Sequence, residues 1–236
     1  MKTLFCSLIS AASLLATPAL AENPVDPQFA AMLRVVEDKD GFTNVRSGPS
    51  VDSKVIEKVL TGSVVSVWET KGDWAIIADD SGKGRDLYVH TSRLKPVTEW
   101  KQTAGKSAKE GEGTVKTGSL EAKVTEAPFV EKDHKITQGE GEKLVDGHQV
   151  WGQDGELPKK EVKLEVKLDG KAVTLPAKAT HDLYEPNPEG LAILTPGKPE
   201  TQAFIYMSAS DGAGAYAVVW AFKDGKYVGR TVFTTN

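Results

Sequence analysis

One strand-like segment near the carboxyl end, AYAVVWAFK at residues 215–223, most constrains how this chain can fold. In an extended segment, alternate side chains point to opposite faces. The larger side chains then share one face: Tyr216, Val218, Trp220 and Phe222. Small or branched apolar side chains occupy the other: Ala217, Val219 and Ala221. Because neither face suits water, we predict a central strand that is covered on both sides.

The neighbouring segments favour antiparallel pairing with this strand. QAFIYMS (202–208) precedes it, and an Asp-Gly turn in KDGK (223–226) leads into YVGRTVFTT (227–235). Asp-Gly between two strand-like runs is typical of a two-residue hairpin. We therefore predict a three-stranded meander at the end of the chain.

A further segment, EVKLEVKLDGKAVTL at residues 161–175, alternates strictly between apolar and charged residues. Such alternation is typical of a strand with one wet face, and Asp169-Gly170 predicts a second hairpin. A covered strand and a half-wet strand together favour an antiparallel sandwich, or a sheet closed by a second layer. The predicted C-terminal β domain spans residues 132–236.

Residues 32–97 contain a second group of short β-like runs, separated by glycine and proline turns. Strands of about five residues with such turns predict a small barrel of about 60 residues. The whole chain is therefore expected to be all-β, with a small N-terminal barrel and a C-terminal antiparallel sandwich-like domain.

Several motifs in the first group occur in a known order. They are NVRSGPS (44–50), KVIEKVLTGSVVSV (54–67), Gly72-Asp73-Trp74 and VHTSRL (89–94). In this order and spacing they resemble the bacterial SH3 domain, or SH3b, family. The family usually has Gly-Trp before the closing valine, whereas this chain has Leu87-Tyr88.

The resemblance implies an SH3-like barrel that binds a cell-wall peptide or an envelope protein. Four side chains are candidates for its contact surface: Arg46, Trp68, Trp74 and Tyr88. For Arg46 and Trp74, a structural role is an alternative to ligand contact. Arg46 can support the Ser47–Ser50 turn, in which Gly48 and Pro49 set the backbone, and Trp74 can belong to the core.

The amino terminus has the pattern of a secretory signal peptide over residues 1–21. Lys2 precedes an apolar run that is short for a membrane span, and Ala19-Leu20-Ala21 is a small-x-small cleavage site. Cys6, the only cysteine, lies inside this segment, so the mature chain has no thiol. An exported chain without disulfides favours a periplasmic or secreted location.

Residues 98–131, between the two β-rich regions, are rich in Lys, Glu, Gly, Thr and Ser. The segment has few large apolar side chains, so it can bury little apolar surface to offset the conformational entropy lost when its backbone is ordered. We therefore predict a flexible linker.

Three loops of the C-terminal domain combine aromatic and acidic residues. The candidate ligand-binding residues are Trp151 and Asp154, then Tyr184, Glu185 and Asn187, and last Asp211 and Tyr216. If the loops meet at one end of the sandwich, they would form a polar-aromatic pocket for a sugar or a peptide. This zone is also similar to uncharacterised bacterial secreted β domains, a likeness that implies no activity.

These patterns favour a non-catalytic envelope binding or adaptor protein. An inhibitor or immunity protein of a cell-wall hydrolase is an alternative, and a small hydrolase using His181, Asp182 and Glu185 is a second one. We expect no cofactor and no metal, since no cysteine or histidine pair has metal-ligand spacing. The mature chain has 28 basic and 33 acidic residues, which does not favour nucleic-acid binding, and no further apolar run predicts membrane insertion.

Overall fold

The computed structural model describes residues 24–139, 141–210 and 212–235. The predicted signal peptide and Asp211 lie outside these residues. The described chain is mostly β-structure in antiparallel sheets, which confirms the predicted fold class. No helix within the described ranges has the length and apolar character needed to cross a bilayer.

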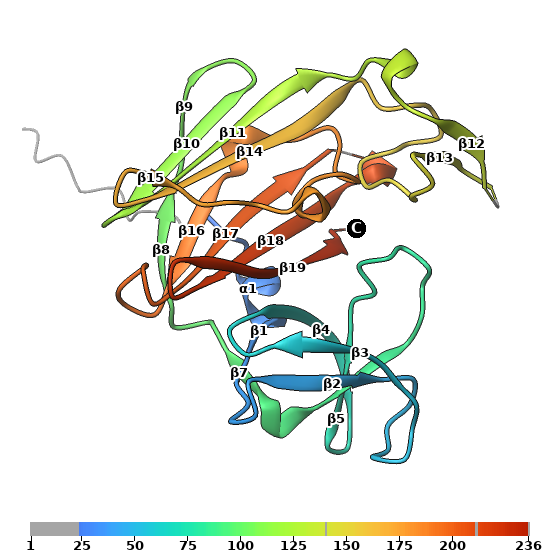
Figure 1. Cartoon of the computed structure of the whole chain (residues 1–236), viewed down its shortest axis with the longest axis vertical. Helices are drawn as coiled ribbons and strands as arrows, with labels where there is room; N and C mark the ends of the chain where they lie inside the picture. Colours follow the sequence, from blue (N-terminus) through green and yellow to red (C-terminus); the bar gives the residue numbers. More distant parts are fainter. Residues whose placement is uncertain (1–23, 140, 211, 236) are drawn as a thin grey trace, which may run out of the picture.

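The N-terminal body is a small barrel, which lies below the rest of the molecule in Figure 1. Helix α1 (Pro27–Met32) precedes it. Its strands are β1 (Leu33–Val36), β2 (Phe42–Arg46), β3 (Val55–Leu60), β4 (Val64–Lys71), β5 (Trp74–Ile77), β6 (Leu87–His90) and β7 (Leu94–Pro96). They pair in the order β3-β2-β6-β5-β4-β1-β7, so β3 and β7 are edges. The barrel core is small: Val36, Val45, Val65, Ala75, Ile77, Leu87, Val89 and Leu94.

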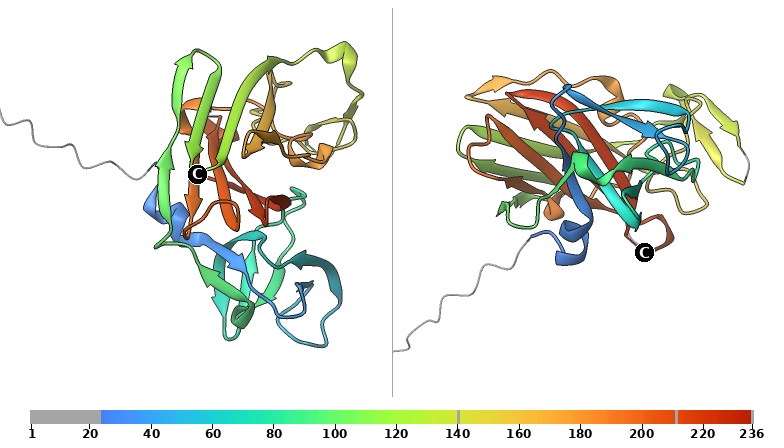
Figure 2. Two further views of the ribbon diagram at one scale, coloured as in Figure 1. Left: turned by 60° about the vertical axis from the view of Figure 1, so that its left-hand side comes forward. Right: turned by 90° about the horizontal axis from the view of Figure 1, so that it is seen from below.

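The C-terminal body is a sandwich of two five-stranded sheets. The inner sheet has the order β19 (Lys226–Thr234), β18 (Tyr216–Lys223), β17 (Gln202–Ala209), β16 (Ala192–Thr195) and β8 (Lys101–Ala104). The outer sheet has the order β15 (Lys171–Ala172), β14 (Lys160–Leu168), β11 (Leu120–Pro128), β10 (Glu112–Thr117) and β9 (Lys106–Lys109). A small hairpin, β12 (Ile136–Gln138) and β13 (Lys143–Val145), projects at one end (Figure 2).

Strand β18 is buried on both faces, as its sequence predicts. Its larger side chains, Tyr216, Val218, Trp220 and Phe222, pack between the two sheets of the sandwich. Its smaller ones, Ala217, Val219 and Ala221, face the N-terminal body. Short side chains let the barrel approach the sheet closely, so the inner sheet becomes the middle of three layers (Figure 1).

The two bodies share a continuous apolar core. From the N-terminal side, Leu33, Val35 and Val64 enter it, and from the inner sheet Phe204 and Phe233 do so. All five are at most 5% exposed. The relative position of the two bodies is therefore fixed by buried apolar contact.

The prediction of a flexible linker over residues 98–131 is wrong. Strands β8 to β11 occupy this segment, and the C-terminal body begins at Lys101 rather than at residue 132. Four apolar side chains on its strands are buried in the sandwich: Val115, Leu120, Ala122 and Val124. They alternate with Lys and Glu residues that face water, so the composition conceals a strand pair with one wet face.

Replacing Leu33 by alanine should lower the free energy of unfolding by about 2–4 kcal/mol, because the leucine is fully buried in the shared core. Urea unfolding followed by tryptophan fluorescence and by far-UV circular dichroism should show one coincident transition. Val51→Ala is the control, since Val51 is 69% exposed. Two separate transitions, only one of which moves with Leu33→Ala, would contradict a shared core.

Candidate functional site

A loop from the barrel, residues 79–86, reaches the inner sheet and lies between two cavities. One cavity, of about 630 Å³, is lined by Trp68 and Trp151, and we call it the tryptophan groove. The other, of about 700 Å³, is lined by His148 and His181, and we call it the histidine cavity. Both bodies line both cavities, so neither cavity exists without the docking of the barrel.

Trp68 faces the tryptophan groove because β4 is irregular at this residue. The pairing of β4 with β5 shifts register between Val67 and Glu69, so Trp68 is the extra residue of a β-bulge. A bulge redirects a side chain relative to the regular alternation. The Trp68 side chain is left 49% exposed, which is unusual for a large aromatic ring.

Trp151 reaches the same groove from the opposite body. Its amide donates to the carbonyl of Asp182 over 2.8 Å, and its carbonyl accepts from the amide of Tyr184 over 3.1 Å. Its ring packs 6.1 Å from that of Tyr216. The backbone and the core thus fix one aromatic wall of the groove.

The 79–86 loop is held by two aspartates with different partners. Asp79 forms a bidentate pair with Arg85, with Nε–Oδ2 of 2.7 Å and Nη2–Oδ1 of 2.9 Å. Partial burial acts to raise the pKa of Asp79, but hydrogen bonds from Arg85 and Ser81 hold that pKa well below its usual range. This bidentate pair makes the loop a stiff wall between the cavities.

Asp80 fastens the loop to β19. Its Oδ1 accepts from the Val232 amide over 3.0 Å and from the Thr231 hydroxyl over 3.2 Å. Burial raises the pKa of Asp80 to about 7, although these hydrogen bonds and the nearby Arg230 charge act in the opposite direction. A polar contact therefore supplements the apolar contact between the bodies.

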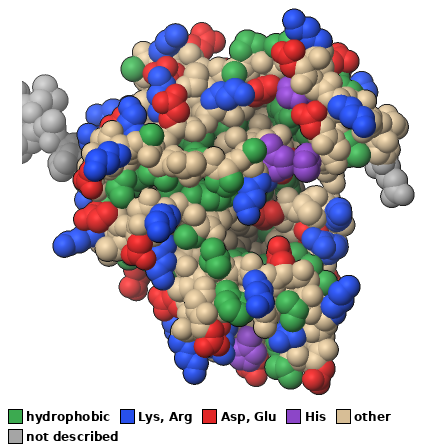
Figure 3. Space-filling model, viewed as in Figure 1, with side chains coloured by type: hydrophobic (Ala, Val, Ile, Leu, Met, Phe, Trp, Pro, Cys, Tyr) green, Lys and Arg blue, Asp and Glu red, His purple; other side chains and the backbone are tan. Residues whose placement is uncertain are grey.

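The histidine cavity contains an ion pair beside two imidazoles. Arg230 Nη2 donates to Asp182 Oδ2 over 2.6 Å, and its Nη1 donates to the Ala179 carbonyl over 3.1 Å. The rings of His148 and His181 meet edge-to-face at 4.3 Å. Desolvation lowers the pKa of His181, which keeps its ring largely neutral at pH 7. Histidine side chains are visible beside the hollow between the bodies in Figure 3.

Three of the four barrel candidates do not line the tryptophan groove. Arg46 donates to the Ser53 carbonyl over 2.8 Å and so supports the turn that follows β2. Trp74 packs edge-to-face on His90 at 5.2 Å, and Tyr88 is only 7% exposed. Only Trp68 of this set lies on the groove.

The three C-terminal loops do meet, but their acids and aromatics separate. Asp154, Glu185 and Asn187 line a cavity of about 480 Å³, and the Ser210 amide donates to the Glu185 carbonyl over 2.8 Å. The aromatic members do not line it: Trp151 belongs to the tryptophan groove, and Tyr184 and Tyr216 are core residues at most 2% exposed. Asp211 lies outside the described residues. Among the described members of the three loops, the acids and the aromatics therefore do not share the polar-aromatic pocket that we considered.

Of the residues considered for a hydrolase, His181 and Asp182 line the histidine cavity, whereas Glu185 lines a different one. Asp182 is paired with Arg230, whereas the Glu185 carboxylate accepts from the amides of Lys159 and Lys160 in the neighbouring cavity. Within the described ranges, no group of three or more His, Cys, Asp or Glu side chains is placed to hold a metal ion.

A histidine clasp, which no sequence pattern signals, holds the β12–β13 hairpin. His134 Nδ1 lies 2.8 Å from Asp146 Oδ2, and its Nε2 lies 2.9 Å from Glu161 Oε1. The ring also stacks on Phe129 with centroids 4.6 Å apart. Hydrogen bonding to Asp146, and then to Glu161, raises the pKa of His134 despite some desolvation. Leu144 of this hairpin and residues 147–149 after it line the histidine cavity, and Gln149 also lines the tryptophan groove.

Comparison with known families assigns one part of the chain. Residues 41–95 match the bacterial SH3 domain, which confirms the resemblance seen in the sequence, and the rest of the chain is unassigned. Comparison with curated proteins and comparison with solved structures each find no match. The family match therefore covers Trp68 but not Trp151.

Replacing His134 by glutamine should remove a pH-dependent part of the stability. A raised histidine pKa stabilises the fold fully below about pH 6.5, its value in an unfolded chain, and this stabilisation disappears as pH rises through the folded pKa. Wild type should exceed His134→Gln by about 1 kcal/mol at pH 5.5 and by little at pH 8.5, in urea unfolding at both values. Asp146→Asn should reproduce the effect, and a difference independent of pH would contradict the clasp.

Proposed function

We propose that this protein is a non-catalytic binding protein of the bacterial envelope, whose tryptophan groove binds a cell-wall peptide. Domains of the matched family typically bind cell-wall material, which supports this class of ligand. The signal-peptide pattern at the amino terminus supports a periplasmic or secreted location.

The observation that carries the proposal is that two tryptophans from different bodies line one groove. Trp68 comes from the SH3 barrel and Trp151 from the C-terminal body. Aromatic rings supply a large contact area with little loss of side-chain freedom, and tryptophans are frequent anchors of binding sites. The groove also offers charged side chains at its rim, from Glu69, Lys71 and Asp86.

This arrangement suits a peptide with both apolar and charged groups. Ile76 and Phe233 add apolar side chains to the lining of the groove, which also carries both signs of charge. Such a groove can hold an aliphatic side chain and orient its flanking polar groups. The C-terminal body then acts as the second wall of an SH3-based site.

Trp68→Ala and Trp151→Ala should each weaken binding to soluble peptidoglycan peptides about tenfold or more, because each removes one wall of the groove. Isothermal titration of the mature chain, residues 22–236, measures this, and retention on purified sacculi gives a second readout. Trp74→Phe is the matched control, since Trp74 does not line the groove.

Two results would contradict the proposal. One is retention on sacculi that neither tryptophan substitution changes. The other is a tight complex with a wall hydrolase in the absence of any binding to sacculi or their peptides, which would instead support an inhibitor or immunity protein.

A further inference from the structure

Strand β19 is an edge of the inner sheet, and two side chains of the barrel form hydrogen bonds to its backbone. The Ser63 hydroxyl donates to the Val228 carbonyl over 2.9 Å, and the Asp80 carboxylate accepts from the Val232 amide over 3.0 Å. These side chains stand where a neighbouring strand would otherwise supply hydrogen bonds. Arg230 lies between these two hydrogen bonds along the strand and lines the histidine cavity.

The pairing of β18 with β19 shows which backbone groups of this edge are open. The Thr235 amide donates to the carbonyl of Ala215, its partner across the strands, so Thr235 and Ala215 form a hydrogen-bonded pair. Counting every second residue along this register, Thr231 and Val219 form another such pair. In an antiparallel pair, hydrogen-bonded and non-hydrogen-bonded positions alternate. The amide and carbonyl of Arg230 therefore point away from β18, toward the cavity.

A second strand edge forms the opposite wall of the same cavity. Strand β3 pairs only with β2, and its residues 57–60 line the cavity. The Thr61 amide donates to the Gly41 carbonyl over 2.9 Å, so every second residue counted back from Thr61 along β3 directs its backbone amide and carbonyl toward β2. By this alternation the backbone of Lys58 also points outward. The cavity thus lies between two unpaired strand edges from different bodies.

Charged side chains of both signs line the cavity. Four are basic, Lys58, Lys83, Lys178 and Arg230, and three are acidic, Glu57, Asp80 and Asp182. Lys83 and Lys178 are exposed, and neither forms an ion pair with another described residue. The charge of Asp182 is balanced by Arg230, with which it pairs. A carboxylate-bearing ligand would therefore meet two cations that have no partner of their own.

Two buried polar atoms of the cavity wall also lack a hydrogen bond. His181 Nδ1 and Asp182 Oδ1 lie 3.5 Å apart without forming one. Asp182 is 6% exposed. Unsatisfied buried polar groups are rare in native proteins and are frequent at functional sites.

We propose that the histidine cavity is a second binding site, which takes a short extended peptide bearing carboxylates. The peptide adds a strand segment to the β19 edge at Arg230, and its carboxylates pair with Lys83 and Lys178. Because Ser63 and Asp80 cover the edge on either side, the paired segment has about three residues. This site goes beyond the tryptophan groove, from which the 79–86 loop separates it.

The chemistry of strand addition distinguishes this ligand from a glycan. Backbone pairing at a strand edge requires alternating amide donors and carbonyl acceptors, which an extended peptide has and a sugar chain lacks. The carboxylates then provide charge complementarity at the rim.

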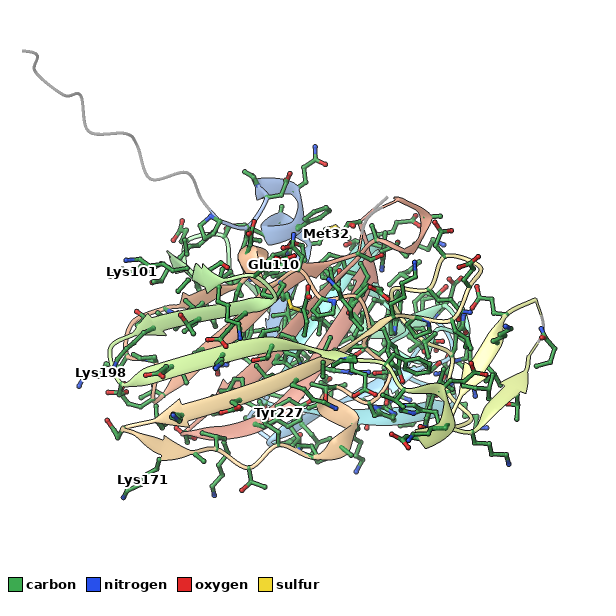
Figure 4. All side chains as sticks on the ribbon, turned by 90° about the horizontal axis from the view of Figure 1, so that it is seen from above. Met32, Lys101, Glu110, Lys171, Lys198 and Tyr227 are labelled. Carbon is green, nitrogen blue, oxygen red and sulfur yellow. The ribbon has the colours of Figure 1, made fainter. Side chains whose placement is uncertain are left out.

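Isothermal titration of the mature chain with the acetylated, amidated peptide Glu-Val-Glu tests the proposal. Binding should weaken about tenfold in the double variant Lys83→Gln/Lys178→Gln, and similarly when glutamine replaces both glutamates of the peptide. Methylation of the valine amide should abolish binding, because it removes a strand donor. Lys198→Gln is the matched control, since Lys198 lies at the end of the sandwich, away from Tyr227 of the cavity wall (Figure 4).

The two binding sites are separable in this experiment. Trp68→Ala should leave the affinity for this peptide unchanged while it reduces retention on sacculi. Absence of measurable peptide binding to wild type, equal affinity in the lysine variants, or equal affinity of the methylated peptide would each overturn the second site without affecting the tryptophan groove.

Discussion

Burial of the inner sheet on both faces is the constraint on which the rest of the structure depends. Strand β18 alternates large and small apolar side chains, so it needs the outer sheet on one face and the barrel on the other. The barrel benefits equally, because a domain of that size buries little apolar surface alone. Each large apolar side chain that enters the shared core contributes about 1.5–3 kcal/mol. Docking of the two bodies is therefore part of the fold, and both cavities between them are consequences of it.

Local patterns predicted most of the β-structure. The two Asp-Gly hairpins form, with Asp169 and Asp224 at positive φ as such turns require, and the family match covers residues 41–95 of the barrel predicted over 32–97. The linker prediction failed because residues 98–131 use few large apolar side chains. Ala122 is fully buried there, and Gly113 packs directly against the Pro188 backbone, so composition underestimates how closely the segment packs. Composition measures apolar area, whereas packing also depends on how near two backbones can come.

The sequence indicated individual residues of the candidate site, but it did not indicate which of them would lie in the same groove. Trp68 and Trp151 were each candidates, yet their meeting depends on a bulge in β4 and on contact between two bodies. Neither feature has a local signature. Tyr184 and Tyr216 were also candidates, but both support the core, since the Tyr216 hydroxyl donates to the Tyr184 carbonyl over 2.7 Å. The His134 clasp joins residues far apart in the chain, so only the folded structure brings its three members together.

The way in which the barrel covers β19 also bears on self-association. An unprotected sheet edge is a template on which a second molecule can add its own strand, which is a route to fibrils. Ser63 and Asp80 occupy hydrogen-bonding positions on that edge, so the barrel also protects it from pairing with a second molecule. Removal of the barrel would uncover this edge together with the face of β18 that carries Ala217, Val219 and Ala221.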